Sequence, residues 1–252
     1  MALSFRQGEI LDIARSEGRV VVEDLAERFS VTLQTIRRDL GELADAGLLD
    51  RVHGGAVVRP GVANTAWSER RGVNAEAKAA IAAACAALIP DNSSLILNIG
   101  TTTEAVAQAL LGHRNLTVVT NNLNVANILA ANESCEVMVA GGALRRADGG
   151  LIGELTTQFF EQFKVDRAVI GCSALDGDGD LLDFDLAEVR VARTILRQAR
   201  QRLVVADASK LTRQAPVRLA SLADLDGLVT DLPLPDPLAR ACEEWGTTIY
   251  LA

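Results

Sequence analysis

Residues 32–40 read TLQTIRRDL, and this stretch decides how the first part of the chain folds. The sequence predicts a helix that starts here and ends near Gly47, with Thr32 as its N-cap and Gly47 as its C-cap. Its apolar residues recur at helical spacing and are expected to face a core: Leu33, Ile36, Leu40 and Leu43.

Two further helices and a hairpin are predicted around this helix. Residues 5–16 and 22–29 each place apolar side chains on one helical face. Residues 48–60, LLDRVHGGAVVRP, indicate two short strands around the Gly54-Gly55 pair. Three helices followed by a hairpin are typical of a winged helix-turn-helix, which we place at residues 1–58.

The polar residues of the third helix are candidates for reading DNA. With Ile36 and Leu40 turned to the core, its polar side chains project outward near the helix start, where a recognition helix meets the major groove. Arginine pairs with guanine, glutamine with adenine, and a helix N-terminus holds phosphate. The hairpin adds wing residues. The candidate DNA-binding residues are Thr32, Gln34, Thr35, Arg37, Arg38, Arg51 and His53.

The charge of the chain limits what kind of nucleic-acid binder it can be. The formal net charge is −8, and the first 60 residues hold eight Arg and no Lys against ten Asp and Glu, a net of −2. An acidic chain cannot neutralise phosphates over a broad surface, which argues against a structural packager of nucleic acid. Binding to double-stranded operator DNA requires arginines gathered on one face.

Residues 74–252 are predicted to form an α/β domain, joined to the first by a linker at residues 59–73. The linker is polar and irregular, whereas the segment after it alternates helices with apolar strands such as SLILNIG at 94–100 and RLVVADAS at 202–209. Continuous apolar strands between helices indicate a mostly parallel sheet covered on both faces.

Polar residues follow several of these strands and indicate a phosphate-type pocket. Carboxyl ends of parallel strands share one edge of a sheet, and open α/β sheets bind ligands there. Gly100 leads into Thr101-Thr102-Thr103 at a helix start, which suits an anion. The candidate effector-binding residues are Gly100, Thr101, Thr102, Thr103, Asn121, Asn122, Gly142, Arg145, Asp183, Glu188 and Lys210.

These motifs resemble those of the DeoR family of bacterial repressors. The resemblance begins with TIRRDL and RVHGGA between residues 6 and 58, and it continues in GTTTEAVAQALLGHRNLTVVTNNLNVAN at 100–127 and LLDFDLAEVRVAR at 181–193. It implies a ribose-5-phosphate-isomerase-like sensor domain, with GTTT as the phosphate loop and Ala208-Ser209-Lys210 as the lysine-bearing loop. Ala174 departs from the family, whose members often carry glycine there.

The GGALRRADGGLIGE segment at 141–154 also matches a member of that family which controls glycerol metabolism genes. The resemblance therefore implies a repressor that glycerol 3-phosphate releases from its operator. A repressor answering to a different sugar phosphate is the alternative. A helix-turn-helix protein is expected to bind as a homodimer or homotetramer.

An enzyme is the competing reading of the second domain. A sugar-phosphate isomerase needs a base and a stabiliser for the enediolate, and Glu188 is the candidate base. The sequence lacks the acidic DGADE-like run and the Lys-Gly-Gly segment of the isomerases. We therefore expect no enzymatic activity.

No cofactor or metal is expected either. The four cysteines have no CxxC spacing, which argues against a zinc site and against a disulfide framework. No secretory signal and no apolar run of membrane-spanning length is visible. The expected location is the cytoplasm, with no membrane partner.

Overall fold

The computed structural model describes residues 4–17, 19–46, 48–52, 54–58 and 72–252. The chain divides into two compact units, residues 1–63 and 64–252. Almost all of the predicted linker, together with Gly47 and His53, lies outside the described residues, so the boundaries at 58 and 74 remain a prediction.

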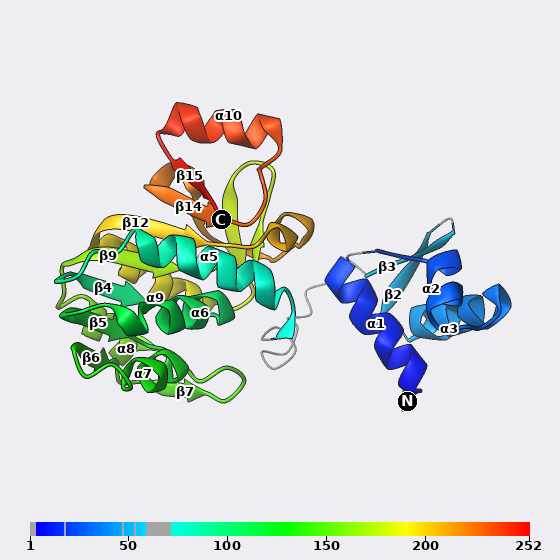
Figure 1. Ribbon diagram of the computed structural model, residues 1–252, viewed down its shortest axis with the longest axis horizontal. Coiled ribbons are helices and arrows are strands. Elements are labelled where there is room, and N and C mark those ends of the chain that lie inside the picture. The colour runs from blue at the N-terminus through cyan, green and yellow to red at the C-terminus, as the bar shows by residue number, and fades with distance from the viewer. Residues whose placement is uncertain (1–3, 18, 47, 53, 59–71) are drawn as a thin grey trace. The chain divides into compact units, whose positions relative to one another are not determined.

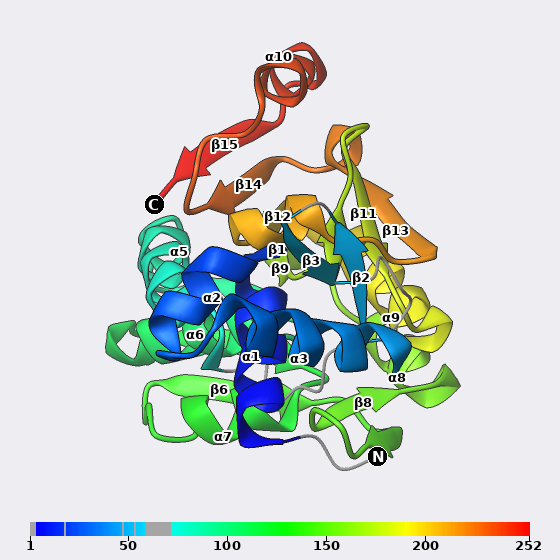
Figure 2. The same cartoon turned by 90° about the vertical axis from the view of Figure 1, so that its right-hand side faces the viewer.

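In its described residues, the N-terminal unit has three helices and a three-stranded antiparallel sheet. Figures 1 and 2 show how these elements are arranged. The predicted hairpin is present, with Gly54 at positive φ in its turn. A third short strand, β1, was not predicted and pairs with β3. The elements are α1 (Phe5–Glu17), β1 (Arg19–Val21), α2 (Val22–Arg28), α3 (Leu33–Asp45), β2 (Leu49–Val52) and β3 (Gly55–Val58).

The core of this unit follows the apolar pattern with one exception. Ile36, Leu40 and Leu43 of α3 are buried against α1 and α2. Thr32 is the N-cap, because its hydroxyl accepts the Thr35 N–H at 3.2 Å. The prediction was wrong for Leu33, which is 40% exposed because it stands in the first turn of α3, outside the core cluster.

The C-terminal unit is built on a seven-stranded sheet whose neighbouring strands are all parallel. The strand order is β15-β14-β12-β9-β4-β5-β6. Its strands are β4 (Ser94–Leu97), β5 (Leu116–Thr120), β6 (Cys135–Val139), β9 (Val165–Ile170), β12 (Ala199–Val205), β14 (Gly227–Thr230) and β15 (Thr248–Leu251).

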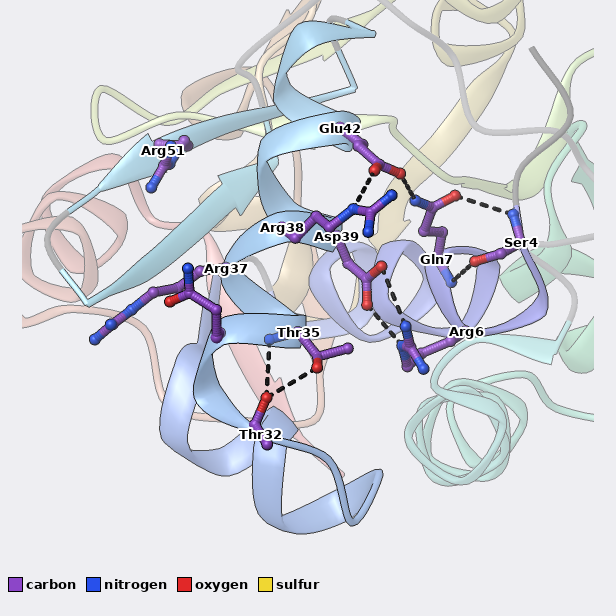
Figure 3. Close-up of a pocket in the computed structure, with 11 residues that line it drawn as sticks. Ser4, Arg6, Gln7, Thr32, Thr35, Arg37, Arg38, Asp39, Glu42 and Arg51 are labelled. Carbon is purple, nitrogen blue, oxygen red and sulfur yellow. Dashed lines mark hydrogen bonds and ion pairs between the residues drawn. The ribbon is translucent and has the colours of Figure 1, made fainter.

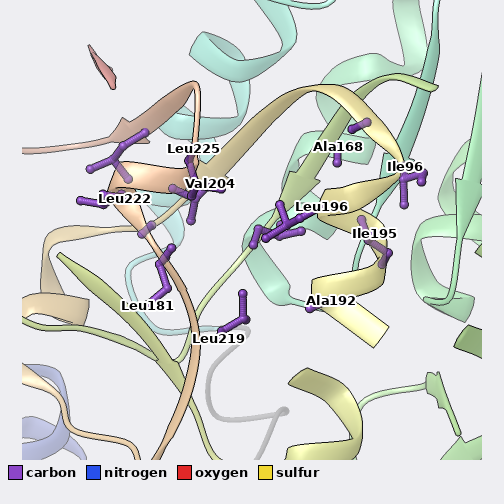
Figure 4. Packing of buried hydrophobic residues seen from close by; sticks show 14 of the residues in the cluster. Ile96, Ala168, Leu181, Ala192, Ile195, Leu196, Val204, Leu219, Leu222 and Leu225 are labelled. Atoms are coloured by element: carbon purple, nitrogen blue, oxygen red, sulfur yellow. The ribbon is translucent and has the colours of Figure 1, made fainter. Parts of the chain in front are cut away.

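Two apolar cores cover the two faces of this sheet. On β4, Leu95 and Leu97 pack with one set of helices and Ile96 with the other, as alternation along a strand requires. Figure 4 shows Ile96 in the second core, close to Ile195 and Leu196. The first set is α5 (Ala75–Ala87), α6 (Thr101–Ala109) and α7 (Leu123–Leu129); the second is α8 (Glu154–Phe160), α9 (Leu186–Arg197) and α10 (Asp236–Trp245).

Smaller elements lie beside the main sheet. The apolar run DRAVIGCSAL at 166–175 does not form one strand, because the strand ends at Ile170 and Ala174–Leu175 pair in a separate sheet. The elements are a hairpin of β7 (Ala143–Arg145) and β8 (Gly150–Ile152), a sheet of β10 (Ala174–Leu175), β11 (Asp180–Asp183) and β13 (Val217–Ser221), and the 3-10 turns η1 (Leu110–Gly112), η2 (Ala208–Thr212) and η3 (Leu222–Asp224).

The strand order creates a switch point beside β4. The chain passes from β4 to β5 and β6 on one side, and then returns to place β9 and β12 on the other side. Crossovers that leave adjacent strands in opposite directions open a crevice at the carboxyl ends of those strands, where α/β sheets bind ligands. Among the described helices, none is long and apolar enough to cross a membrane.

Candidate functional site

The predicted DNA-binding residues that the structure describes lie together on one face of the N-terminal unit. They line an open groove between α1, α3 and the hairpin, as Figure 3 shows. His53 lies outside the described residues. The groove is lined by Ser4, Arg6, Gln7, Thr32, Gln34, Thr35, Arg37, Arg38, Asp39, Glu42 and Arg51.

The two adjacent arginines of α3 have different surroundings. The Nε of Arg38 pairs with a Glu42 oxygen at 2.9 Å, one helical turn on. Hydrogen bonds from Arg38 and then Gln7 lower the pKa of Glu42, so this carboxylate is charged at neutral pH. Arg37 is exposed and makes no ion pair with the described residues, and Figure 3 shows it pointing away from the acidic side chains.

Sequence reasoning did not identify five lining residues of this groove: Ser4, Arg6, Gln7, Asp39 and Glu42. The spacing of Arg38 and Glu42, four residues apart on a helix, was a readable signal for their pairing. The contacts from α1 to α3 join residues more than thirty positions apart, so no local pattern reveals them.

A second site lies at the switch point of the C-terminal sheet. A small cavity of about 30 Å³ opens between the carboxyl ends of β4, β9 and β12. Six of the eleven predicted effector-binding residues line it: Gly100, Thr101, Thr102, Asp183, Glu188 and Lys210. Six further residues line the cavity and were not predicted: Ile99, Asp148, Gly171, Cys172, Ser173 and Val205.

One end of the cavity is built from the start of α6. Gly100 precedes this helix with φ of 150°, a conformation that favours glycine. No described side chain caps α6. The first turn of a helix leaves its N–H groups without intrahelical acceptors, and together with the helix dipole they favour an anion. This end of the cavity can therefore bind a phosphate or a carboxylate.

Lys210 adds a positive charge to the cavity. It lies in η2, after β12, and its Nζ stands 3.9 Å from an oxygen of Asp207. The neighbouring Lys210 charge and hydrogen bonds from Ser209 and Asn74 hold the pKa of Asp207 below its usual range, against the effect of burial. Asp207 thus remains a carboxylate that holds the lysine in place.

The opposite wall of the cavity is acidic. Ser173 donates to a buried oxygen of Asp183 at 3.1 Å. Burial and then the Asp183 charge raise the pKa of Glu188 to about 7, although Arg145 lowers it. Carboxylates of this kind accept hydrogen bonds from hydroxyl groups.

Arg145 does not line the cavity but holds two of its acidic residues. Its guanidinium pairs with Asp148 at 2.5 Å and with Glu188 at 2.6 Å, and it also reaches Asp185, the N-cap of α9, at 3.0 Å. Burial lowers the pKa of Arg145, but the hydrogen bonds and charges of Asp148 and Glu188 outweigh it and raise the pKa. A single side chain therefore ties the β7–β8 hairpin to α9.

Four of the predicted residues lie outside the cavity and make contacts within the fold. Thr103 donates its hydroxyl to the carbonyls of Asn98 and Gly100. Asn121 donates to the Leu151 carbonyl, and Asn122 caps α7. A Cβ on Gly142 would clash with Thr156. Asn121 and Asn122 follow β5, and Gly142 follows β6. In the sheet these two strands lie on one side of β4, whereas β9 and β12 lie on the other.

Both units match family models that agree with this geometry. Residues 6–60 match the model of the DeoR-like helix-turn-helix domain. Residues 73–232, more than half of the chain, match the model of the DeoR C terminal sensor domain.

The chain belongs to the DeoR family.

Named relatives of this DeoR-family protein are transcriptional repressors rather than enzymes. The glycerol-3-phosphate regulon repressor of Escherichia coli is 47% identical over 91% of both chains. The repressor of the same name from Haemophilus influenzae is 45% identical over 100% of this chain and 98% of its own. Among solved structures, ribose 5 phosphate isomerase A from Neisseria gonorrhoeae is 14% identical and covers 54% of this chain and 53% of its own, with a TM-score of 0.40.

The comparisons and the sheet confirm the predicted fold class. A DeoR-like helix-turn-helix precedes an α/β sensor domain with a parallel sheet.

Proposed function

We propose that this protein represses transcription by binding operator DNA through α3 and the hairpin, and that glycerol 3-phosphate releases it. The observation that carries the proposal is the meeting of an uncapped helix start, a lysine and three acidic residues in one cavity at the switch point of the sheet. Relatives named as glycerol-3-phosphate regulon repressors support the choice of ligand.

The cavity matches the two ends of such a ligand. The phosphate is placed at the N–H and hydroxyl groups of Thr101 and Thr102 and beside Lys210, where a helix start and a cation both favour an anion. The two hydroxyl groups are placed at Asp183 and Glu188, which accept hydrogen bonds.

The small volume of the cavity supports a link between binding and release. A space of about 30 Å³ holds little more than a water molecule, so the walls have to move for a phosphorylated three-carbon ligand to enter. A ligand shifts a conformational equilibrium only by its different affinity for the two states. We propose that the opened state is the one with low affinity for DNA.

The DNA-binding form is a symmetric oligomer in the cytoplasm. Helix-turn-helix proteins bind two half-sites about one helical turn apart, so a homodimer or homotetramer presents two copies of α3.

Calorimetry with the full-length protein tests the ligand. We expect glycerol 3-phosphate to bind more tightly than glycerol, inorganic phosphate or ribose 5-phosphate. Lys210→Ala and the double variant Thr101→Ala with Thr102→Ala should weaken binding roughly 10- to 150-fold, since each removes hydrogen bonds to a charged group. Lys164→Ala is the matched control, because Lys164 lies at the amino end of β9, whereas the cavity lies at the carboxyl ends of the strands.

Release of DNA is measured in parallel on a duplex that the wild-type protein selects from a random library. The cavity variants should hold that duplex at ligand concentrations that release the wild type. Tighter binding of another sugar phosphate would replace glycerol 3-phosphate as the ligand. Normal ligand binding by the cavity variants would rule out this cavity as the sensor site.

A further inference from the structure

Two neighbouring side chains of α1 reach across to the DNA-reading helix. The Nε of Arg6 donates to Asp39 at 2.6 Å, and its Nη2 donates to the other Asp39 oxygen at 3.3 Å. Asp39 is 6% exposed, and it directly follows the Arg37-Arg38 pair. A bidentate pair of this kind fixes direction as well as distance.

The second contact runs through Gln7. Its Nε2 donates to Glu42 at 2.5 Å, and Glu42 in turn pairs with Arg38. The other end of the Gln7 amide is already engaged, because its Oε1 accepts the Ser4 N–H at 3.0 Å while the Gln7 N–H donates to the Ser4 hydroxyl. This reciprocal capping box fixes which atom of the amide faces Glu42.

These contacts provide hydrogen-bond donors for the two carboxylates of the groove. A surface that meets phosphates carries two carboxylates, Asp39 and Glu42. Each accepts hydrogen bonds from α1, and Figure 3 shows both on the α1 side of α3, with Arg37 on the other side. Arg6 therefore offsets the charge of Asp39, Gln7 holds Glu42 by a hydrogen bond, and both contacts tie α1 to α3.

We infer that Arg6 and Gln7 are positioning residues for DNA recognition, which act on the reading arginines through Asp39 and Glu42. This inference rests on the proposed binding of operator DNA by α3. If Arg6 instead contacted a phosphate directly, the expected effect of Asp39→Asn on DNA affinity would be the opposite.

The test uses full-length protein and two duplexes of equal length, one selected by the wild type from a random library and one scrambled. The quantity measured is the ratio of the two affinities. We expect Arg6→Gln, Asp39→Asn and the double variant each to lower this ratio about tenfold, without additivity, since all three break one coupled pair. The dependence of selected-duplex binding on salt should stay at the wild-type slope.

Direct phosphate contact gives a different set of results. Arg6→Gln would then make the salt slope shallower by about one, and Asp39→Asn would tighten binding by removing a negative charge. That pattern, or a wild-type ratio in the double variant, overturns the inference. The double variant also decides the matter if Arg6→Gln fails to fold, because it leaves no buried carboxylate without its cation.

Gln7→Glu tests the second contact. Glutamate keeps the capping box with Ser4 but replaces the donor to Glu42 by a second carboxylate. We expect α1 to remain folded by circular dichroism and the affinity ratio to fall severalfold. An unchanged ratio would remove Gln7 from the inference. Failure of the wild type to select any duplex would instead refute the proposed function itself.

Discussion

Glu188 is a buried acid that the fold keeps protonated well above the usual range of a carboxyl group. Its pKa of about 7 lies above that of the unfolded chain, so the folded state binds the extra proton between these two values. The free energy of unfolding should therefore fall as pH rises through this window. Asp207 and Asp185 have lowered pKa values and act in the opposite direction, in more acidic solution.

We expect this group to reduce stability by on the order of 3 kcal/mol between about pH 5 and about pH 8. Glu188→Gln removes the titrating group, so the variant should lose that part of the pH dependence. Urea unfolding across the pH range measures it, with Glu244→Gln on the exposed face of α10 as the control. Equal pH dependence in the wild type and Glu188→Gln would contradict the assignment.

At the same scale, the sequence predicted six of the twelve residues that line the cavity at the switch point. Lys210 and Gly100 could be predicted because each stands just after an apolar strand. Asn121 and Gly142 do so as well, yet they lie away from the cavity. Strand order decides between these cases, and strand order depends on contacts between distant segments that no local pattern contains.

Among the elements, the β7–β8 hairpin depends most on a single side chain. Arg145→Ala would leave the buried carboxylates of Asp148 and Glu188 without their cation, which should reduce stability by about 3–5 kcal/mol. Urea unfolding measures the loss, and hydrogen exchange in residues 143–152 should show the hairpin opening first. Arg146→Ala, at the exposed neighbouring position, is the control. Equal effects of the two substitutions would show that the ion pairs do not hold the hairpin.

The elements that were predicted are those with a clear apolar pattern. α3 has apolar residues at helical spacing, and β4 and β12 are continuous apolar runs, whereas β15 was not predicted. β1, β7, β8 and β10 have two or three residues each, too few for a period to be visible. They form because partners elsewhere in the chain supply their hydrogen bonds, as β3 does for β1.

At the scale of the whole molecule, the chain has a net charge of −8, so its phosphate contacts have to come from arginines gathered on one face. Four arginines line the groove, and Arg6 is paired with Asp39, which leaves Arg37, Arg38 and Arg51 to meet phosphates. We expect the logarithm of the affinity for the selected duplex to fall with the logarithm of salt concentration with a slope of about −3 for each bound N-terminal unit. A slope steeper than about −6 would show that arginines outside this face also contact phosphates.

The placement of the ligand cavity has a consequence for how such proteins evolve. Most residues that line it come from segments that follow strands and from helix starts, whereas the two apolar cores lie on the faces of the sheet; of the lining residues, Val205 belongs to one of these cores. Under the proposed function, a substitution at Asp183 or Ser173 would alter which molecule is sensed while the packing of the cores is inherited unchanged. A lineage with this architecture would then acquire new inducers one cavity residue at a time.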